Sequence, residues 1–248
     1  MWSYIPYMTP IFKSDYSIGK SILTIENIVK LYKKTNEKFL VLVEDSMTGF
    51  VKAHNLTKQN DIHLVFGLRV SCCNDVSKEN DNSDHKVIIL AKNDQGCKLL
   101  NKIYSFAHIG NKGQVDFNYL NTIWNNDSLE LVIPFYDSFI YQNQLYLKNC
   151  IPNFNKIKPI FWIEKNNLPF DDIISQAVFE YCKDKYDSEL VKSVLYEKKD
   201  DAEALQTYKI ICGRKFGRPS TLSCPNLNHF GSNEFCFESY LENERTTA

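Results

Sequence analysis

Residues 85–109 read HKVIILAKNDQGCKLLNKIYSFAHI, a short apolar run followed by a longer segment of mixed character. Residues 87–91 contain no polar side chain, which is typical of a strand buried on both faces of a parallel sheet. In the segment 94–109, apolar residues recur at the spacing of one helix face: Cys97, Leu100, Ile103 and Tyr104. The stretch therefore predicts a buried strand followed by an amphipathic helix.

The same alternation continues on both sides of this stretch. Helices are predicted over 22–34 (with Thr24 as N-cap), 51–58, 171–184, 200–212 and 234–244. Buried strands are predicted over 39–43, 62–70, 129–135, 140–146 and 158–163. Polar segments predict loops over 71–84 and 217–231. Because the alternation continues without a break in composition, we expect one α/β domain with a mainly parallel sheet.

Size and composition narrow the class of protein. A chain of 248 residues is long for one domain, but α/β barrels commonly reach this length. The 29 basic and 30 acidic residues give a net charge of −1, so broad non-specific attraction to DNA is not indicated. The 44% hydrophobic and 24% charged content is ordinary for a soluble globular protein.

Several common classes of site and location are not indicated by the sequence. Its eight cysteines include no C-x-x-C pair, so a zinc site is not expected and free thiols in a reducing cytoplasm are. The glycine patterns that hold dinucleotides or nucleoside triphosphates are missing. The N-terminus has no signal-peptide pattern and no apolar run has membrane-spanning length, so we expect a cytoplasmic protein that does not bind membranes.

Five stretches resemble, in order, the PHP domain of bacterial C-family DNA polymerase III alpha subunits. They are SDYS at 14–17, FLVLVEDSMTG at 39–49, FGLRV at 66–70, HKVIILAKNDQGC at 85–97 and VKSVLYEKKDDAEALQTY at 191–208. The DAEA at 201–204 is the clearest short match. The resemblance covers nearly the whole chain and implies a PHP-type distorted (β/α)7-like barrel with mainly parallel strands. We expect a single PHP-like domain over 1–248, with the tail 217–248 forming a loop and a short closing helix.

The resemblance also implies where a metal site would lie. PHP enzymes hold two or three metal ions with His, Asp, Glu and sometimes Cys, and use them to hydrolyse phosphate esters. Such bridging metals lower the pKa of bound water and hold the phosphate. In this sequence the cluster of family metal positions falls on Ile11, Lys13, Lys20, Glu44, Asp45, Arg69, His85, Tyr136, Ser193 and Leu195.

Most of these residue types cannot bind a metal ion. Only Glu44, Asp45 and His85 keep a ligating side chain, so we expect no catalytic residue, no metal and no cofactor. Lys13 and Arg69 would project where metal ions lie in the family, close to the three remaining ligands. A salt-bridged cluster would then hold the strand ends together. It would fix their positions rather than add much stability, because the cost of desolvating the charges offsets much of their attraction.

Simpler interpretations remain open for several of these residues. His85 is an ordinary hydrogen-bonded or surface histidine, or a surviving ligand. Glu44 and Asp45 form a relic metal site, an ion pair with Arg69 or Lys13, or a solvated pair. The basic residues Arg214, Lys215 and Arg218 contact phosphate or belong to a solvated loop.

The favoured function is that of a degenerate PHP-like domain that acts as a scaffold in DNA replication. The resemblance implies two partners, the polymerase catalytic core and a proofreading exonuclease, with DNA contacted only indirectly or weakly. The polymerase palm is missing, so we expect a fragment or one subunit of a split polymerase in a bacterial or phage-infected cytoplasm. The alternatives are an active metal-dependent phosphoesterase or 3′–5′ exonuclease around Glu44, Asp45 and His85, and a free-standing binding protein of PHP ancestry.

Overall fold

The computed structural model describes residues 8–78, 84–212 and 232–247. Within these ranges, seven strands close into a barrel. In order around the ring they are β1 (Thr9–Phe12), β8 (Asp187–Val194), β7 (Ile160–Ile163), β6 (Leu129–Ile133), β4 (His85–Ala91), β3 (Leu64–Cys73) and β2 (Leu40–Glu44). All neighbours pair in parallel except β4, which runs antiparallel to β3 and β6. A short strand, β5 (Gln114–Asp116), pairs with the end of β3 outside the ring. The predicted mainly parallel (β/α)7-like barrel is confirmed.

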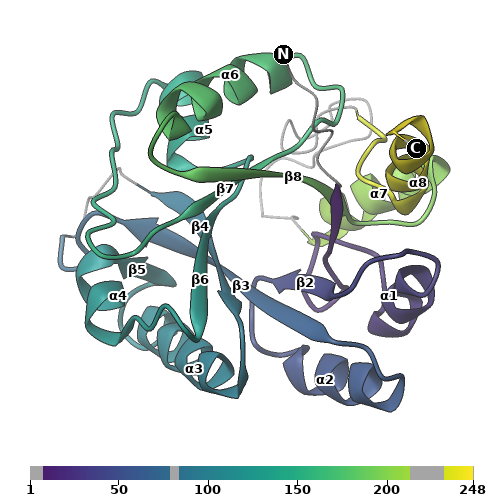
Figure 1. The fold of residues 1–248 in the computed structure, drawn as a ribbon, viewed down its shortest axis with the longest axis horizontal. Helices are drawn as coiled ribbons and strands as arrows, with labels where there is room; N and C mark the ends of the chain where they lie inside the picture. The colour runs from purple at the N-terminus through teal and green to yellow at the C-terminus, as the bar shows by residue number, and fades with distance from the viewer. Residues whose placement is uncertain (1–7, 79–83, 213–231, 248) are drawn as a thin grey trace.

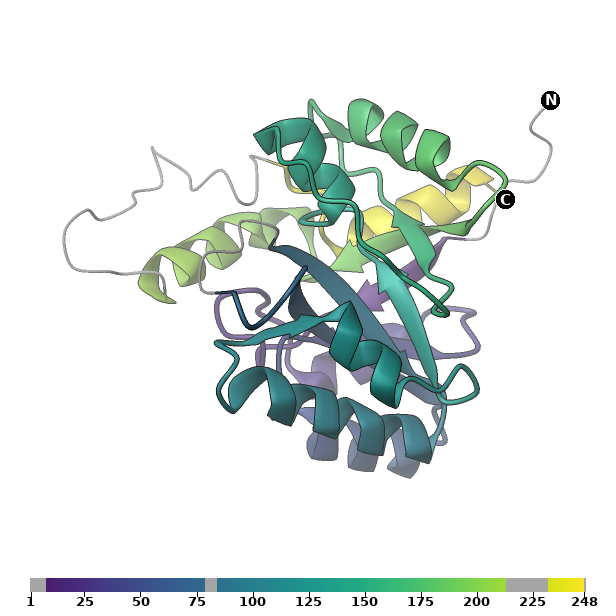
Figure 2. The same cartoon turned by 90° about the vertical axis from the view of Figure 1, so that its left-hand side faces the viewer.

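Helices surround the ring of strands (Figure 1). They are α1 (Ile25–Tyr32), α2 (Phe50–Gln59), α3 (Asp94–His108), α4 (Phe117–Ile123), α5 (Phe139–Tyr146), α6 (Asp171–Cys182), α7 (Ala202–Cys212) and α8 (Phe237–Thr247), with a 3₁₀ turn, η1 (Lys199–Asp201), before α7. Figure 1 and the turned view in Figure 2 both place α3 and α6 on opposite sides of the strands. None of the helices in the described ranges is long and apolar enough to cross a membrane.

Alternation along the strands produces two apolar cores. Side chains that point into the barrel form a small inner cluster: Ile11, Val41, Val43, Ile88, Leu90, Val132, Trp162 and Val191. Their neighbours in sequence point outward and join the larger core between strands and helices. Gly67 lies on the inner side, where an added Cβ would come within 2.7 Å of Leu90 Cδ2. The inner core is therefore tightly packed at this level.

Polar side chains fix the starts of several helices. Thr24 caps α1 as predicted, because its hydroxyl accepts a hydrogen bond from the Asn27 amide at 3.3 Å. Asn93 caps α3 in the same way through the Gly96 amide. The absence of a side chain at Gly96 is required there, since a Cβ would lie 2.2 Å from the Ser128 carbonyl oxygen. These contacts set the direction in which each helix leaves its strand.

Most predicted elements are confirmed with ends shifted by a few residues, but two predictions are wrong. Residues 140–146 form α5 rather than a strand, because Ser138 caps the segment and its first turn buries Phe139, Ile140 and Tyr141 together. Residues 71–73 continue β3 rather than starting a loop, because Cys72 and Cys73 are buried and pair with β5. The predicted loop over 217–231 lies outside the described residues.

Candidate functional site

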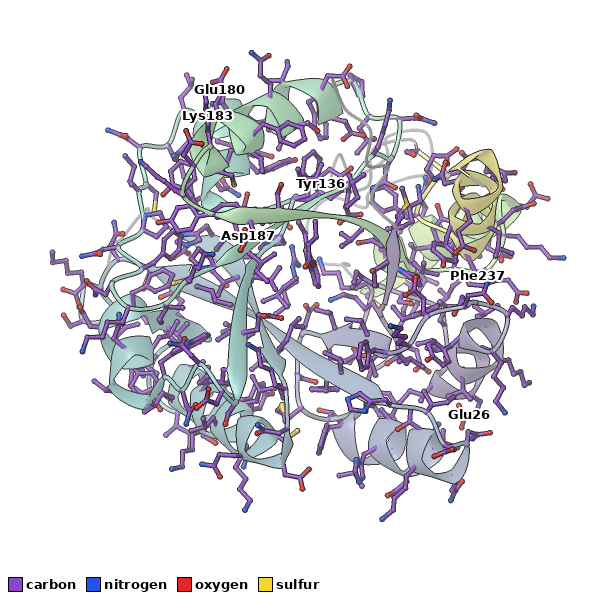
Figure 3. The ribbon with its side chains drawn as sticks, viewed as in Figure 1. Glu26, Tyr136, Glu180, Lys183, Asp187 and Phe237 are labelled. Carbon is purple, nitrogen blue, oxygen red and sulfur yellow. The ribbon has the colours of Figure 1, made fainter. Side chains whose placement is uncertain are left out.

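The carboxyl ends of the parallel strands meet at one mouth of the barrel, where α/β barrels carry their chemistry. A cavity of about 190 Å³ opens there between polar and apolar walls. Its polar lining includes Lys13, Lys20, Arg69, Tyr136, Glu164 and Ser193. Figure 3 labels Tyr136 toward the middle of the molecule, whereas Glu180 and Lys183 lie at its outer edge. The mouth is therefore the candidate site.

Lys13 and Asp45 form an ion pair at this mouth. Lys13 follows β1 and Asp45 follows the adjacent β2, and Lys13 Nζ lies 2.8 Å from Asp45 Oδ1. Although burial acts to raise it, the charges of Lys13 and Arg69 hold the pKa of Asp45 below its ordinary value. Burial lowers the pKa of Lys13, and Asp45 opposes that shift. The two side chains therefore stabilise each other's charge.

Arg69 pairs with a carboxylate that the sequence did not suggest. Arg69 projects inward from β3, and its Nη2 lies 2.6 Å from Oδ2 of Asp137, just beyond β6. Asp137 adopts a left-handed backbone conformation, with φ of 62°. The ion pair joins two strands of the ring that are separated by β4.

Glu44 is turned away from the cavity although it is next to Asp45. Its carboxylate is fully buried and accepts hydrogen bonds from the Ser14 amide at 3.0 Å and from the Ser17 hydroxyl. Ser17 Oγ also accepts from the Asp45 amide at 2.9 Å. Burial raises the pKa of Glu44. Because successive strand residues face opposite sides, Glu44 anchors the loop after β1 while Asp45 faces the mouth.

The expected place of His85 beside Lys13, Arg69, Glu44 and Asp45 is wrong. The His85 side chain is buried in the outer core, with its ring 5.9 Å from that of Phe139 and its Nδ1 3.7 Å from Cys150 Sγ. The side chain of the next residue along β4, Lys86, points into the barrel. It lies on the same face of the strand as Ile88, which belongs to the inner core. Strand alternation therefore removes the remaining imidazole from the mouth.

The other predicted positions divide between the cavity and the core. Ser193 and Tyr136 line the cavity; Ser193 Oγ donates to Glu164 Oε1 at 2.9 Å and Tyr136 OH donates to Asp171 Oδ1 at 3.0 Å. Ile11 and Leu195 are buried apolar side chains of its wall, and Lys20 is exposed at its edge. Arg214, Lys215 and Arg218 lie outside the described residues.

Glu164 is a site residue that the sequence reasoning missed. It directly follows β7, is buried, and accepts from the Ser193 amide at 3.1 Å and from Asn166 Nδ2 at 3.1 Å. Burial raises the pKa of Glu164 above its ordinary value. A carboxylate directly after an apolar run was the available signal, since Glu44 follows the apolar run 40–43 in the same way.

Lys192 is the second missed residue, and it faces outward from β8. Its side chain is fully buried, and Nζ donates to Asn166 Oδ1 at 2.8 Å and to the Lys165 carbonyl at 3.3 Å. Glu234, close to α8, lies 3.8 Å away. The lysine thus ties the segment after β7 and the C-terminal segment to the barrel wall.

The residues present at the mouth do not fit the metal cluster of the family. In the described part of the chain, no three or more His, Cys, Asp or Glu side chains are placed so that they could hold a metal ion. Of the carboxylates at the mouth, Asp45 is paired with Lys13, Asp137 is paired with Arg69, and Glu164 accepts hydrogen bonds from Ser193 and Asn166. Ammonium and guanidinium groups donate hydrogen bonds only, so they repel a cation rather than bind it.

A sequence profile of the PHP domain matches residues 12–139, which is just over half of the chain. No curated protein matches the sequence. The matched range begins at the last residue of β1 and ends at the start of α5, so it covers β2 to β6 in full and includes the Lys13–Asp45 and Arg69–Asp137 pairs. The chain belongs to the PHP domain family.

Proposed function

We propose that this protein is a catalytically degenerate PHP domain that acts as a structural scaffold in a replicative DNA polymerase. The observation that carries the proposal is the pair of salt bridges at the barrel mouth. Lys13, Asp45 and Arg69 stand at positions that the sequence resemblance assigns to metal ligands, and each of them takes part in one of the two salt bridges. The salt bridges link β1 to β2 and β3 to the residues after β6 without a cofactor.

The arrangement does not favour phosphoester hydrolysis around Glu44, Asp45 and His85. Glu44 is bound by Ser14 and Ser17, Asp45 by Lys13, and His85 lies in the outer core. Because their side chains face different surroundings, the three cannot converge on one metal ion or one water molecule. Metal-assisted hydrolysis requires such convergence.

The polymerase context rests on the sequence resemblance over 14–208. The proposed partners are the polymerase catalytic core and a proofreading exonuclease. Exposed apolar side chains at the end of α5 and just after it support a docking role: Tyr146, Leu147 and Ile151 are 60%, 90% and 69% exposed. A free-standing binding protein of PHP ancestry remains the alternative, and co-purification from the native host distinguishes the two by the identity of the bound protein.

Elemental analysis of the purified chain tests the proposal most directly. The protein is dialysed against zinc and manganese, then against metal-free buffer, and its metal content is measured. The scaffold proposal expects no ion retained in stoichiometric amount. Two or more ions per chain, with release of phosphate from a model ester, would replace it with an active phosphoesterase.

A further inference from the structure

A second cavity adjoins the barrel mouth and extends toward α3. It measures about 220 Å³ and shares Lys20, Arg69 and Asp137 with the first cavity. Lys86 and Ser71 line it from β4 and β3, and Tyr104 and His108 close it from α3. The cavity is thus bounded by rigid elements on two sides and by an exposed lysine on a third.

Positive charge exceeds negative charge around this cavity. Lys13, Lys20, Arg69 and Lys86 lie within electrostatic range of Asp45 or Asp137. Both carboxylates are already engaged, Asp45 by Lys13 and Asp137 by Arg69. Four cations against two carboxylates leave two positive charges.

The excess charge is carried by Lys20 and Lys86. Neither forms an ion pair with any residue in the described ranges. The Lys86 ammonium instead donates to the neutral hydroxyl of Ser71, its cross-strand partner in the β3–β4 ladder. Burial and the nearby charges of Arg69 and Lys20 lower the pKa of Lys86, and Asp45 and Asp137, which act to raise it, do not offset them.

We propose that this side cavity binds a doubly charged oxyanion, the phosphate or sulfate group of a small molecule, without a metal ion. Two unbalanced positive charges match the charge of a dianion. The hydrogen-bond donors around the cavity approach it from different sides. Lys86 and Ser71 offer fixed donors inside the cavity, and Arg69 has further N–H groups besides the one that bonds Asp137. Lys20, which is exposed, closes over the anion from the rim. Charge-assisted hydrogen bonds of this kind are the strong ones. The site binds and does not hydrolyse, so it is a property separate from the proposed scaffold role.

Isothermal titration of the whole chain with sodium phosphate, in buffer containing a chelator, tests the site. Lys86→Met removes the inner charge and Lys20→Gln removes the outer one. Lys158→Gln is the matched control, since Lys158 makes an exposed ion pair with Asp187 and lines neither cavity. Circular dichroism melting checks the fold of each variant. Lys20 is exposed, so its variant is expected to fold normally even if Lys86→Met does not.

The expected result is one phosphate or sulfate bound per chain with chelator present. Lys86→Met should weaken binding roughly tenfold and Lys20→Gln roughly threefold, while the control keeps the wild-type affinity. Phenyl phosphate then identifies the source of the anion: tighter binding than phosphate indicates a phosphorylated small molecule, and equal or weaker binding indicates the free ion. Unchanged affinity in both lysine variants, binding only after zinc or manganese is added, or no binding at millimolar phosphate would overturn the proposal.

Discussion

Lys13 Nζ lies 2.8 Å from Asp45 Oδ1, which joins the residues after two adjacent parallel strands of the barrel. The register that pairs Ile11 with Val41 brings both side chains to the same mouth. The Lys13 side chain is 12% exposed and that of Asp45 33%, so the pair is only partly screened by water. The ion pair therefore holds together the ends of two adjacent strands at the barrel mouth.

Removing the lysine alone should destabilise the protein. Lys13→Met leaves Asp45 partly buried and unpaired, and we expect a loss of about 1–3 kcal/mol in the free energy of unfolding, reduced because one third of Asp45 is exposed. The double variant Lys13→Met/Asp45→Asn should recover part of that loss. Urea denaturation of the four proteins measures the coupling. Additive single losses would mean that the pair is not coupled.

Replacing Glu164 by glutamine should change the pH dependence of stability. Burial raises the folded-state pKa of Glu164 above its ordinary 4.5. Its contribution to stability is therefore fully present below pH 4.5 and is lost as the pH rises through the raised pKa. Glu164→Gln, which keeps an acceptor for the Ser193 amide, should match the wild type near pH 4 and exceed its stability at pH 8.

Glu164→Ala serves as the comparison, because it leaves the partly buried Ser193 amide without its acceptor. We expect it to lose about 1–3 kcal/mol at both pH values. Chemical denaturation at pH 4 and pH 8 measures all three proteins. A Glu164→Gln protein less stable than the wild type at pH 8 would mean that the carboxylate is needed in its ionised form.

Lys209→Met should stabilise the protein near neutral pH. Burial and the charge of Lys20 lower the pKa of Lys209 to about 6, and its Nζ has no hydrogen-bond partner among the described residues. Between pH 6 and the ordinary lysine pKa of 10.5, Lys209 is protonated in the unfolded chain but neutral in the folded protein. The free energy of unfolding that Lys209 removes from the protein therefore grows as the pH falls through this range. Lys209→Met removes this penalty, with an expected gain of about 1 kcal/mol at pH 7.

The pH dependence of that gain identifies its cause. It should be largest at pH 6 and below and should vanish above pH 10.5, where lysine is neutral in both states. Thermal melting at several pH values follows it, with the exposed Lys158→Met as control. A gain that does not vary with pH would be an effect of packing rather than of charge.

Gly67→Ala should destabilise the inner core of the barrel. The added methyl group would lie 2.7 Å from Leu90 Cδ2 and 3.0 Å from Val43 Cγ2, inside the ring of strands. We expect a loss of about 1–3 kcal/mol from overpacking, and partial recovery in Gly67→Ala/Leu90→Val, which makes room for the methyl. Urea denaturation compares the two. A fully stable single variant would show that the inner core has free space at this level.

Elements with one clear hydrophobic pattern were predictable from the sequence. β2 and β4 each contain a continuous apolar run, and α3 repeats its apolar residues at helical spacing. β8 had no such pattern, because its first three residues are polar and exposed and its buried Lys192 is charged. The prediction of a strand over 140–146 was wrong because a short apolar run is compatible with a strand or a helix. The Ser138 cap and the packing of the first turn make this segment the helix α5.

The sequence by itself determined the alternating α/β architecture and the resemblance to PHP domains. These features depend on composition and on the order of residues along the chain, so they can be read without knowing which residues are in contact. Only the tertiary structure decided which side chains share the mouth. Strand alternation sends Glu44 and His85 outward, while barrel closure brings Asp137 to Arg69 and Glu164 to Ser193 across residues far apart in sequence. Partners fixed by ring closure have no local signature, because the closure depends on the whole set of strand pairings.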